Sequence, residues 1–289
     1  FSIHVRDAAG RRVVNYEGNW RDIFQNWEGL LPSEPAFAGS MIEAFLGAMT
    51  PDGYNPYRIG RHGIDWEVIE HDNPWSHIGY WGDHQVVYLL RLLEAAQARD
   101  PQLLPGLWDR ALFSFADVPY RLKPHAEQTA NPKATIVFDD AAHARAHARA
   151  ARVGADGLMV CDAEAHPVLA TLAEKLSIIL LAKAGSLVPG GGLWLHTQRP
   201  EWNDANNALV GNGLSVVTLA HLRRLLVFIT ALPGADRAFD LPTATLAALQ
   251  ALAALVRTTP PSAVDDAVAR RRFMDDAGAL LDAWRAAAY

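Results

Sequence analysis

Residues 83–99 have the sequence DHQVVYLLRLLEAAQAR, whose apolar side chains recur with helical periodicity. The apolar positions are Val86, Val87, Leu89, Leu90, Leu92 and Leu93. Asp83 stands at the start, where a carboxylate accepts hydrogen bonds from the first free backbone N–H groups of a helix. We therefore expect a helix over Asp83–Arg99.

The same periodicity extends over most of the chain on both sides of this stretch. Glu34–Met49 is apolar at helical spacing and stops at Pro51-Asp52-Gly53, a sequence typical of turns. Asp139 and Asp140 lead the stretch Asp139–Val153 and favour a helix N-terminus there. We expect helices over Glu34–Met49, Asp83–Arg99, Pro101–Phe115, Asp139–Val153, His166–Ala184, Asn206–Leu232, Thr243–Arg257 and Ser262–Ala287.

Few segments have strand character. Ser2–Val5 is a candidate strand, and Thr135–Phe138 and Gly157–Val160 are two β-like runs that we expect to pair. Residues 116–134 have the composition of a loop, and Pro189–Gly192 is either a flexible hinge or a loop of close backbone approach. Eight helices without a break in composition predict a single all-α domain over residues 1–289, with helical hairpins side by side and a site at one loop-bearing end.

Composition excludes several classes of function. The net charge of −6 is spread along the chain without a basic stripe, which excludes nucleic acid as a partner. The longest apolar stretch, Leu214–Leu232, contains His221, Arg223 and Arg224, which predicts a buried helix and no membrane span. The single cysteine, Cys161, excludes an internal disulfide and is typical of a cytoplasmic protein, although the periplasm stays open. Because the sequence begins at Phe1, we expect it to be part of a longer protein that holds further domains.

Tryptophan is abundant near the start of the chain. Five of the nine tryptophans fall within the first 81 residues, in segments rich in Gly, Asn, Asp and Pro. Burial in the core is the ordinary explanation for tryptophan. An aromatic face in a loop is also suited to stacking on the C–H face of a sugar ring.

Three segments concentrate polar and aromatic side chains. They are residues 18–27, residues 54–83 and residues 199–207. Cleavage of a glycosidic bond needs a carboxylic acid that protonates the leaving oxygen, a nucleophile on the opposite face of the ring, and groups that hold the sugar hydroxyls. In the third segment Glu201 and Asp204 are three residues apart and face the same side if the turn is helical.

Two of these segments resemble a known family. Trp202-Asn203-Asp204, preceded by Glu201 and followed by Asn206-Asn207, resembles the Asp-Trp-Asn-Asp-Gly-Met-Asn motif of cellobiose and chitobiose phosphorylases. Arg21-Asp22 followed by Gln25 resembles the Arg-Asp-x-x-Gln-Asp element that lies earlier in the same family. These enzymes share an (α/α)6-toroid catalytic domain with other inverting enzymes.

The resemblance implies a role for each matching residue. Asp204 would be the general acid, Trp202 would line the sugar subsite, and Arg21 and Asp22 would hold hydroxyls of the sugar that is cleaved. Around them we expect a sugar floor of Trp20 and Trp27, with hydrogen bonds from Gln25, Asn203, Asn207 and Glu201. The implied function is inverting cleavage of oligosaccharides on an (α/α)6-toroid-like scaffold, without a metal or organic cofactor.

The departures from the family bear on the reaction. Ala205 replaces the Gly of the motif, Asn206 its Met, and Asn26 the Asp that follows Gln25. Eight helices are fewer than the twelve of a complete toroid, and the family's phosphate-binding pattern does not appear after Asp204. The sequence therefore does not support inorganic phosphate as a co-substrate. Because it does not exclude phosphate either, the enzyme is a hydrolase or a phosphorylase. A hydrolase would need a carboxylate base about 6.5–9.5 Å from the acid, with Asp22, Asp65, Glu67 and Asp83 as candidates.

Structural explanations compete with these roles. Asp204 or Asn203 could cap the helix that follows, and Arg21-Asp22 could be an ion pair. A non-catalytic sugar-binding or scaffold domain would keep the tryptophans without a placed acid, and a helical protein–protein adaptor would have no cleft.

Two groups of histidines could suggest a metal site, but the surrounding sequence supports neither. The histidines and aspartates of residues 62–84 lack a tight structural metal motif, so hydrogen bonding in loops is the simpler interpretation. His143 and His147 have the spacing of a metal pair on a helix, but no third ligand is nearby and a solvated helix face explains them. Gly190-Gly191-Gly192 lacks the other residues of a phosphate loop.

Overall fold

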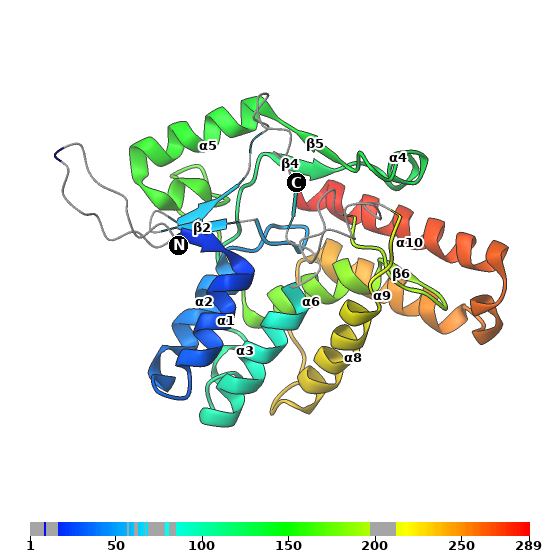
Figure 1. Ribbon diagram of the computed structural model, residues 1–289, viewed down its shortest axis with the longest axis horizontal. Coiled ribbons are helices and arrows are strands. Elements are labelled where there is room, and N and C mark those ends of the chain that lie inside the picture. Colours follow the sequence, from blue (N-terminus) through cyan, green and yellow to red (C-terminus); the bar gives the residue numbers. More distant parts are fainter. Residues whose placement is uncertain are drawn as a thin grey trace.

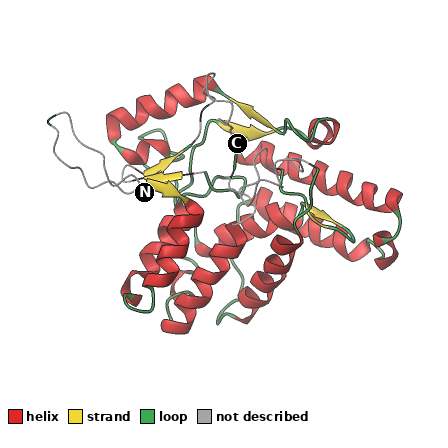
Figure 2. Cartoon of the chain, in the orientation of Figure 1, coloured by secondary structure: helices red, strands yellow, loops and turns green. Residues whose placement is uncertain are grey.

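The computed structural model describes residues 9, 17–56, 58–60, 63–66, 68, 79–80, 85–196 and 212–289, and for residues 17–22, 58 and 60 it describes the backbone only. This part of the chain is mostly helical, as Figure 2 shows. Its α-helices are α1 (Trp20–Leu30), α2 (Ala38–Gly47), α3 (Gln85–Arg99), α4 (His125–Ala130), α5 (Asp140–Val153), α6 (Leu172–Ala184), α8 (Val216–Ala231), α9 (Thr243–Thr258) and α10 (Ala267–Ala288).

Short antiparallel strands form three small sheets in the described part of the chain. The strands are β1 (Glu17–Asn19), β2 (Arg58–Gly60), β3 (Gly63–Asp65), β4 (Tyr120–Leu122), β5 (Ile136–Phe138), β6 (Leu187–Val188) and β7 (Gly192–Leu193). They pair in the orders β1-β2-β3, β4-β5 and β6-β7. Single 3-10 turns at Pro35–Phe37, Pro105–Leu107, Ala155–Leu158 and Pro261–Val264 complete the regular structure.

The helices pack in a row around one core. In Figure 1, α1, α2, α3 and α8 lie side by side in the lower half, and α3 contacts each of the other three. The row continues through α6, α9 and α10. The β4–β5 pair and α5 lie above it, and the C-terminus ends near β4 in the middle of the molecule. Fully buried side chains such as Ile42, Leu89 and Ile179 fill the core between them.

Capping residues fix where several helices begin. The side chain of Asp139 accepts a hydrogen bond from the backbone N–H of Ala142 at the start of α5. Thr171 does the same for α6, Ser215 for α8 and Asp266 for α10. Because these oxygens satisfy backbone donors that have no partner inside the helix, the starts are encoded locally.

The predicted all-α class is confirmed in its coarse form. The predicted helices at Asp139–Val153 and Thr243–Arg257 agree with α5 and α9 within one residue at each end. The helix that was predicted at Glu34–Met49 corresponds to α2, which is shorter at both ends. The one at Asp83–Arg99 corresponds to α3, which ends at Arg99 as predicted and is described from Gln85. The one at Ser262–Ala287 corresponds to α10, which begins five residues later and ends one residue later. Within the residues that the structure describes, no helix is long and apolar enough to cross a membrane.

The predicted helix at Pro101–Phe115 is wrong. Only Pro105–Leu107 forms a 3-10 turn, and the backbone beyond it is extended. The N–H groups of Leu112 and Phe113 both donate to the carbonyl of Ala170, which lies far along the sequence. These long-range partners replace the i to i−4 bonds of a helix, and periodicity cannot reveal them.

The expected pairing of Thr135–Phe138 with Gly157–Val160 is also wrong. The first run is β5, but its partner is β4, which lies in residues 116–134 that were expected to be a loop and that also contain α4. Ala155–Leu158 forms a 3-10 turn instead of a strand. Gly157 approaches α5 so closely that a Cβ would stand 2.4 Å from the backbone nitrogen of Ala150.

Two predicted helices begin later than expected. Residues 167–170 are extended because Val168 and Ala170 donate to carbonyls of other segments, so α6 begins only at Leu172. Helix α8 begins at Val216, because Ser215 exchanges both backbone hydrogen bonds with Leu193. The predicted stretch from 206 to 211, and the strand at Ser2–Val5, lie outside the described residues.

The apolar stretch Leu214–Leu232 was expected to form a buried helix, but only part of it is buried. Helix α8 buries Thr218, Leu222 and Leu225, whereas Val216 and Val217 are largely exposed. Pro189–Gly192 turns between β6 and β7, and a Cβ on Gly191 would stand 2.5 Å from Leu214 Cδ1. Of the two interpretations of this loop, close backbone approach is therefore confirmed.

Candidate functional site

Most residues of the predicted sugar site lie outside what the structure describes. Glu201, Trp202, Asn203, Asp204 and Asn207 belong to residues 197–211, which are not described. The side chains of Trp20, Arg21 and Asp22 are not described either, but their backbone forms the first turn of α1. Of the candidate bases, Glu67 and Asp83 are outside the described residues, as are His62, His71, His77 and His84.

Two predicted sugar contacts on α1 are described. The Nε2 of Gln25 donates to the hydroxyl of Tyr88 on α3 at 2.8 Å, and the rest of this side chain is exposed. Trp27 is partly buried and meets the ring of Phe24 edge-on, with the centroids 5.1 Å apart. Trp27 thus already contributes one part of its surface to the core.

The first two polar segments are joined by the small sheet. Asn19 of β1 pairs with Arg58 of β2, and Arg58 pairs in turn with Asp65 of β3. The side chain of Asp65 is half-buried and accepts a hydrogen bond from the backbone N–H of Trp66 at 2.8 Å. The start of α1, where Arg21 and Asp22 lie, therefore follows directly on a strand held by the second segment.

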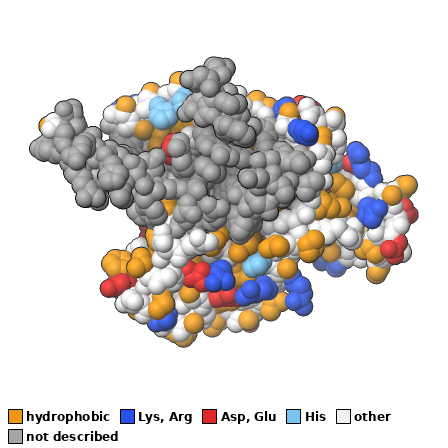
Figure 3. Space-filling view, viewed as in Figure 1, with side chains coloured by type: hydrophobic (Ala, Val, Ile, Leu, Met, Phe, Trp, Pro, Cys, Tyr) orange, Lys and Arg blue, Asp and Glu red, His pale blue; other side chains and the backbone are white. Residues whose placement is uncertain are grey.

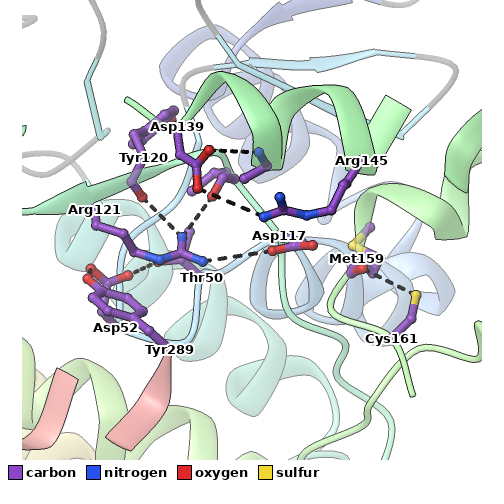
Figure 4. A network of polar contacts seen from close by, with 12 residues as sticks. Thr50, Asp52, Asp117, Tyr120, Arg121, Asp139, Arg145, Met159, Cys161 and Tyr289 are labelled. Carbon is purple, nitrogen blue, oxygen red and sulfur yellow. Dashed lines mark hydrogen bonds and ion pairs between the residues drawn. The ribbon is translucent and has the colours of Figure 1, made fainter. Parts of the chain in front are cut away.

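A buried carboxylate organises the centre of the molecule. Asp52 is fully buried, and no other carboxylate in the described part of the chain is. Thr50 Oγ1 donates to its Oδ1 at 2.6 Å, and the Tyr289 hydroxyl donates to its Oδ2 at 2.6 Å (Figure 4). The Tyr80 hydroxyl lies 3.3 Å from the same Oδ2. Three hydroxyl groups, one from the same turn and two from distant parts of the chain, thus compensate for the desolvation of Asp52.

Aromatic rings surround this carboxylate. The rings of Tyr54 and Tyr80 stack at 4.7 Å, and the ring of Tyr120 meets that of Tyr80 edge-on at 4.9 Å. Burial, and then the negative charge of Asp52, raise the pKa of Tyr289 and of Tyr80 above the ordinary range. Both phenols therefore stay protonated. Tyr289 donates to Asp52, and Tyr80 shares its proton between Asp52 and the nearer carbonyl of Tyr120 at 3.0 Å.

Cations form the outer part of this centre. The guanidinium of Arg121 stands 4.4 Å from the ring centroid of Tyr289, and the ammonium of Lys183 stands 4.4 Å from that of Tyr54. A second ionic group adjoins through β4, where Arg121 lies 3.8 Å from Asp117 (Figure 4). Asp117 also accepts from Arg149 of α5 at 2.7 Å. These pairs connect the Asp52 centre to α5.

A directional chain of hydrogen bonds fixes His196. Nε2 of Gln128 donates to the carbonyl of Lys123, so its Oε1 faces Nδ1 of His196 at 2.6 Å and must accept from it. Nε2 of His196 lies 3.1 Å from Oγ of Ser186, whose hydroxyl donates to the carbonyl of Ala182 at 2.7 Å. Burial, and then the positive charges of Arg285, His125 and Lys183, lower the pKa of His196 well below its ordinary value. His196 is therefore neutral.

His196 also marks the point where residues 197–211 begin. Directly after β7, Trp194 donates its backbone N–H to the carbonyl of Ser186. Two residues later, the carbonyl of His196 accepts from the hydroxyl of Thr135. Beyond the undescribed residues the chain returns at Ser215, which is hydrogen-bonded to Leu193. The described residues on either side of residues 197–211 are thus held next to β7.

Described residues of the second segment, and the last described residue before the third, lie in or beside the Asp52 centre. Tyr54 and Tyr80 belong to the second segment. Burial raises the pKa of Tyr54, on which the charges of Arg285 and Asp52 and a hydrogen bond with Ser186 also act. Ser186 in turn contacts His196, the last described residue before the third segment. The structure therefore brings the borders of both segments to one buried polar region.

Histidines on α5 form a separate cluster. The indole N–H of Trp66 donates to Nδ1 of His143 at 3.1 Å, and the ring of His147 stands 4.4 Å from that of His143. Figure 3 shows histidine side chains at the surface over α5. His143 is half-buried, so the expectation of a solvated face holds only for His147. The described residues contain no group of three or more metal-ligating side chains.

An open groove of about 610 Å³ lies between α4 and α10. Asp275 binds both Arg271 and His125 there, the latter at 2.8 Å. The ionic side chains that line the groove thus bind one another. None of the predicted sugar-binding residues is among the described residues that line it.

The residues of the Asp52 centre were not predicted from the sequence. Asp52 looked like part of a turn that ends a helix, and Tyr289 and Arg285 looked like the end of a helical face. The one local signal is Gly53, whose φ of +90° and 2.8 Å approach to Ala182 Cβ require a residue without a side chain.

Comparison with known proteins gives no family. No protein-family model matches the chain, and no curated protein matches it significantly.

Proposed function

We propose that the chain cleaves glycosidic bonds in oligosaccharides with inversion, with Asp204 as the general acid. The observation that carries the proposal is that Tyr54 of the second segment and His196, the last described residue before the third, both adjoin Ser186 in one buried polar region. Together with the Trp202-Asn203-Asp204 sequence and the mostly helical fold, this supports a shared site.

The proposed reaction follows from the chemistry of the residues. Asp204 protonates the glycosidic oxygen while water or phosphate attacks the anomeric carbon from the opposite face. Trp202, Trp20 and Trp27 provide the surface on which the sugar ring stacks. The remaining polar groups that would hold the hydroxyls are Arg21, Asp22, Gln25, Asn203, Asn207 and Glu201.

A hydrolase would need a base to activate the water. Asp22 and Asp65 are the candidates favoured by the small sheet, because β1 leads into Asp22 and β3 ends at Asp65. A phosphorylase would need no such base, since phosphate is itself the nucleophile. The scaffold would be an (α/α)6-toroid-like arrangement, and the serial packing of the helices from α1 to α10 is consistent with it.

Asp204→Asn tests the acid. The variant keeps the shape of the side chain but cannot donate a proton, so we expect turnover to fall by about 10²–10⁴-fold while sugar binding persists. The measurement is a screen of disaccharides with and without phosphate that detects released reducing sugar and sugar 1-phosphate. Asp236→Asn, at an exposed position in the turn between α8 and α9, is the matched control.

The second candidate function is non-catalytic sugar binding by the same tryptophans. It predicts that the wild type binds oligosaccharides without releasing any product, with or without phosphate. Wild-type turnover that survives unchanged in Asp204→Asn would exclude Asp204 as the acid.

A further inference from the structure

Helix α9 exposes one complete face that is uncharged over most of its length. Its buried residues Thr245, Ala248 and Leu252 lie on the opposite side, where α9 packs on α6 and α10. The exposed face is a stripe that recurs every three or four positions and consists of Thr243, Leu246, Ala247, Gln250, Ala254 and Arg257. No charged residue occurs from position 241 to position 256. The outer face of a surface helix ordinarily carries charges, whereas the centre of a protein interface is depleted of them.

The stripe is centred on Gln250. Leu246 and Ala254 are each four residues from it, and Thr243 and Arg257 are each seven residues from it. When a second α9 lies antiparallel on this face, with a two-fold axis at Gln250, Leu246 of one copy lies over Ala254 of the other. A large side chain over a small one lets two helices approach closely along their length. The two amides at the axis can each donate and accept a hydrogen bond.

The charges at the two ends of α9 complement each other in this arrangement. Arg257 lies in the last turn, Asp240 lies three residues before the first, and both are exposed. Antiparallel pairing brings Arg257 of each copy to the start of the other α9, where Asp240 of that copy lies. Two symmetric ion pairs then close the ends of an interface whose middle is uncharged.

We propose that α9 forms a reversible homodimer by pairing antiparallel with α9 of a second copy. A helix of 16 residues is about 24 Å long and about 10 Å wide, so this face is smaller than the roughly 800 Å² per partner of a standard stable interface. The dimer therefore belongs to the transient class and dissociates on dilution. This inference does not depend on the proposed sugar chemistry.

Sedimentation equilibrium of the full chain tests the dimer. Over concentrations from about 1 µM to about 1 mM, we expect the mass to rise from that of one chain toward that of two. Gln250→Glu places two like charges on the two-fold axis and should lower the association constant at least tenfold. Gln102→Glu makes the same charge change at an exposed position after α3 and should leave the association constant unchanged.

Reversal of the end charges tests the antiparallel orientation. Arg257→Glu alone should weaken the dimer, because it places two carboxylates at each end. Combination with Asp240→Arg should restore the association constant, because each pair is then attractive again. Both positions are exposed, so an unchanged Tm is the check that these variants fold.

A cysteine at the proposed axis gives a second geometric test. At a helix separation of about 10 Å, the two Cα atoms of position 250 are about 5 Å apart, which a disulfide can span. In a Cys161→Ser background, mild oxidation should link two copies of Gln250→Cys. Ala148→Cys on the exposed side of α5 should stay unlinked. A single-chain mass at 1 mM, an association constant unaffected by Gln250→Glu, or equal linkage at positions 250 and 148 would overturn the proposal.

Discussion

At the scale of single residues, the bond between Trp66 and His143 fixes a protonation state. The indole N–H can only donate, so Nδ1 of His143 carries a lone pair and the proton of the neutral ring is on Nε2. A protonated Nε2 is not a metal ligand, so this bond argues against a metal on the His143 and His147 pair. Protonation of Nδ1 would break the bond to Trp66.

This bond predicts a dependence of stability on pH. Burial, and then the positive charge of His147, lower the pKa of His143 below its ordinary value of 6.5. The unfolded chain therefore takes up a proton before the folded chain does. The contribution of His143 to stability is complete above pH 6.5 and is lost as the pH falls through the folded-state pKa.

An NMR titration of the histidine rings measures this pKa. We expect His147→Ala to raise the pKa of His143, because it removes a like charge, and Trp66→Phe to raise it as well, because it removes a donor to the neutral form. His221→Ala, on the distant helix α8, is the control and should leave the pKa of His143 unchanged. A pKa of His143 above 6.5 in the wild type would contradict the interpretation.

At the scale of elements, a single glycine decides how α4 packs on α10. A Cβ on Gly278 would stand 2.2 Å from Cγ of His125, so the imidazole of α4 lies directly on the backbone of α10. Asp282 and Asp275 of α10 hold the same histidine through its backbone N–H and its Nε2. Helix propensity alone favours alanine over glycine at such a position, so packing has the larger effect.

Two glycine-to-alanine substitutions separate packing from propensity. Gly278→Ala should lower the free energy of unfolding by about 1–3 kcal/mol, because His125 must move. Gly29→Ala in α1, where no atom lies within 4 Å of the added Cβ, should raise it by up to about 1 kcal/mol. Chemical denaturation of both variants measures the difference, and equal effects would refute the packing argument.

At the scale of the whole molecule, the Asp52 centre joins parts of the chain that are far apart in sequence. Tyr289 and Asp52 are separated by 237 positions, and Tyr80 and Tyr120 come from two further segments. The end of α10 is thereby fixed to the turn that follows α2. Because the carboxylate is fully buried, each hydroxyl that it loses leaves an unsatisfied lone pair in a medium of low polarity.

Tyr289→Phe removes one of these donors without changing the shape of the ring. We expect a loss of about 1–3 kcal/mol in the free energy of unfolding, measured with urea. Tyr88→Phe is the matched control: Gln25, which donates to the Tyr88 hydroxyl, is exposed and can turn to water. A loss in Tyr289→Phe no larger than in the control would show that Tyr289 does not stabilise Asp52.

The sequence alone determined the helices whose signals are local. Periodicity placed α5 and α9 almost to the residue, because each helical hydrogen bond joins positions four apart. For α5 the cap of Asp139, which acts within one turn, adds to this signal. The Trp202-Asn203-Asp204 motif is local in the same way, so the sequence predicts a sugar-cleaving acid there, and that stays a prediction.

Only the tertiary structure decided which segments are extended and which polar groups are buried. The partner of β5 is β4, and residues 112–113 bond to Ala170, because a strand obtains its hydrogen bonds from wherever the fold brings another backbone. From the sequence alone, Asp52 is a turn residue and Arg285 is a residue on a helix face, whereas the structure buries both. Their chemistry depends on burial, which is set by side chains up to 237 positions away and which no local pattern encodes.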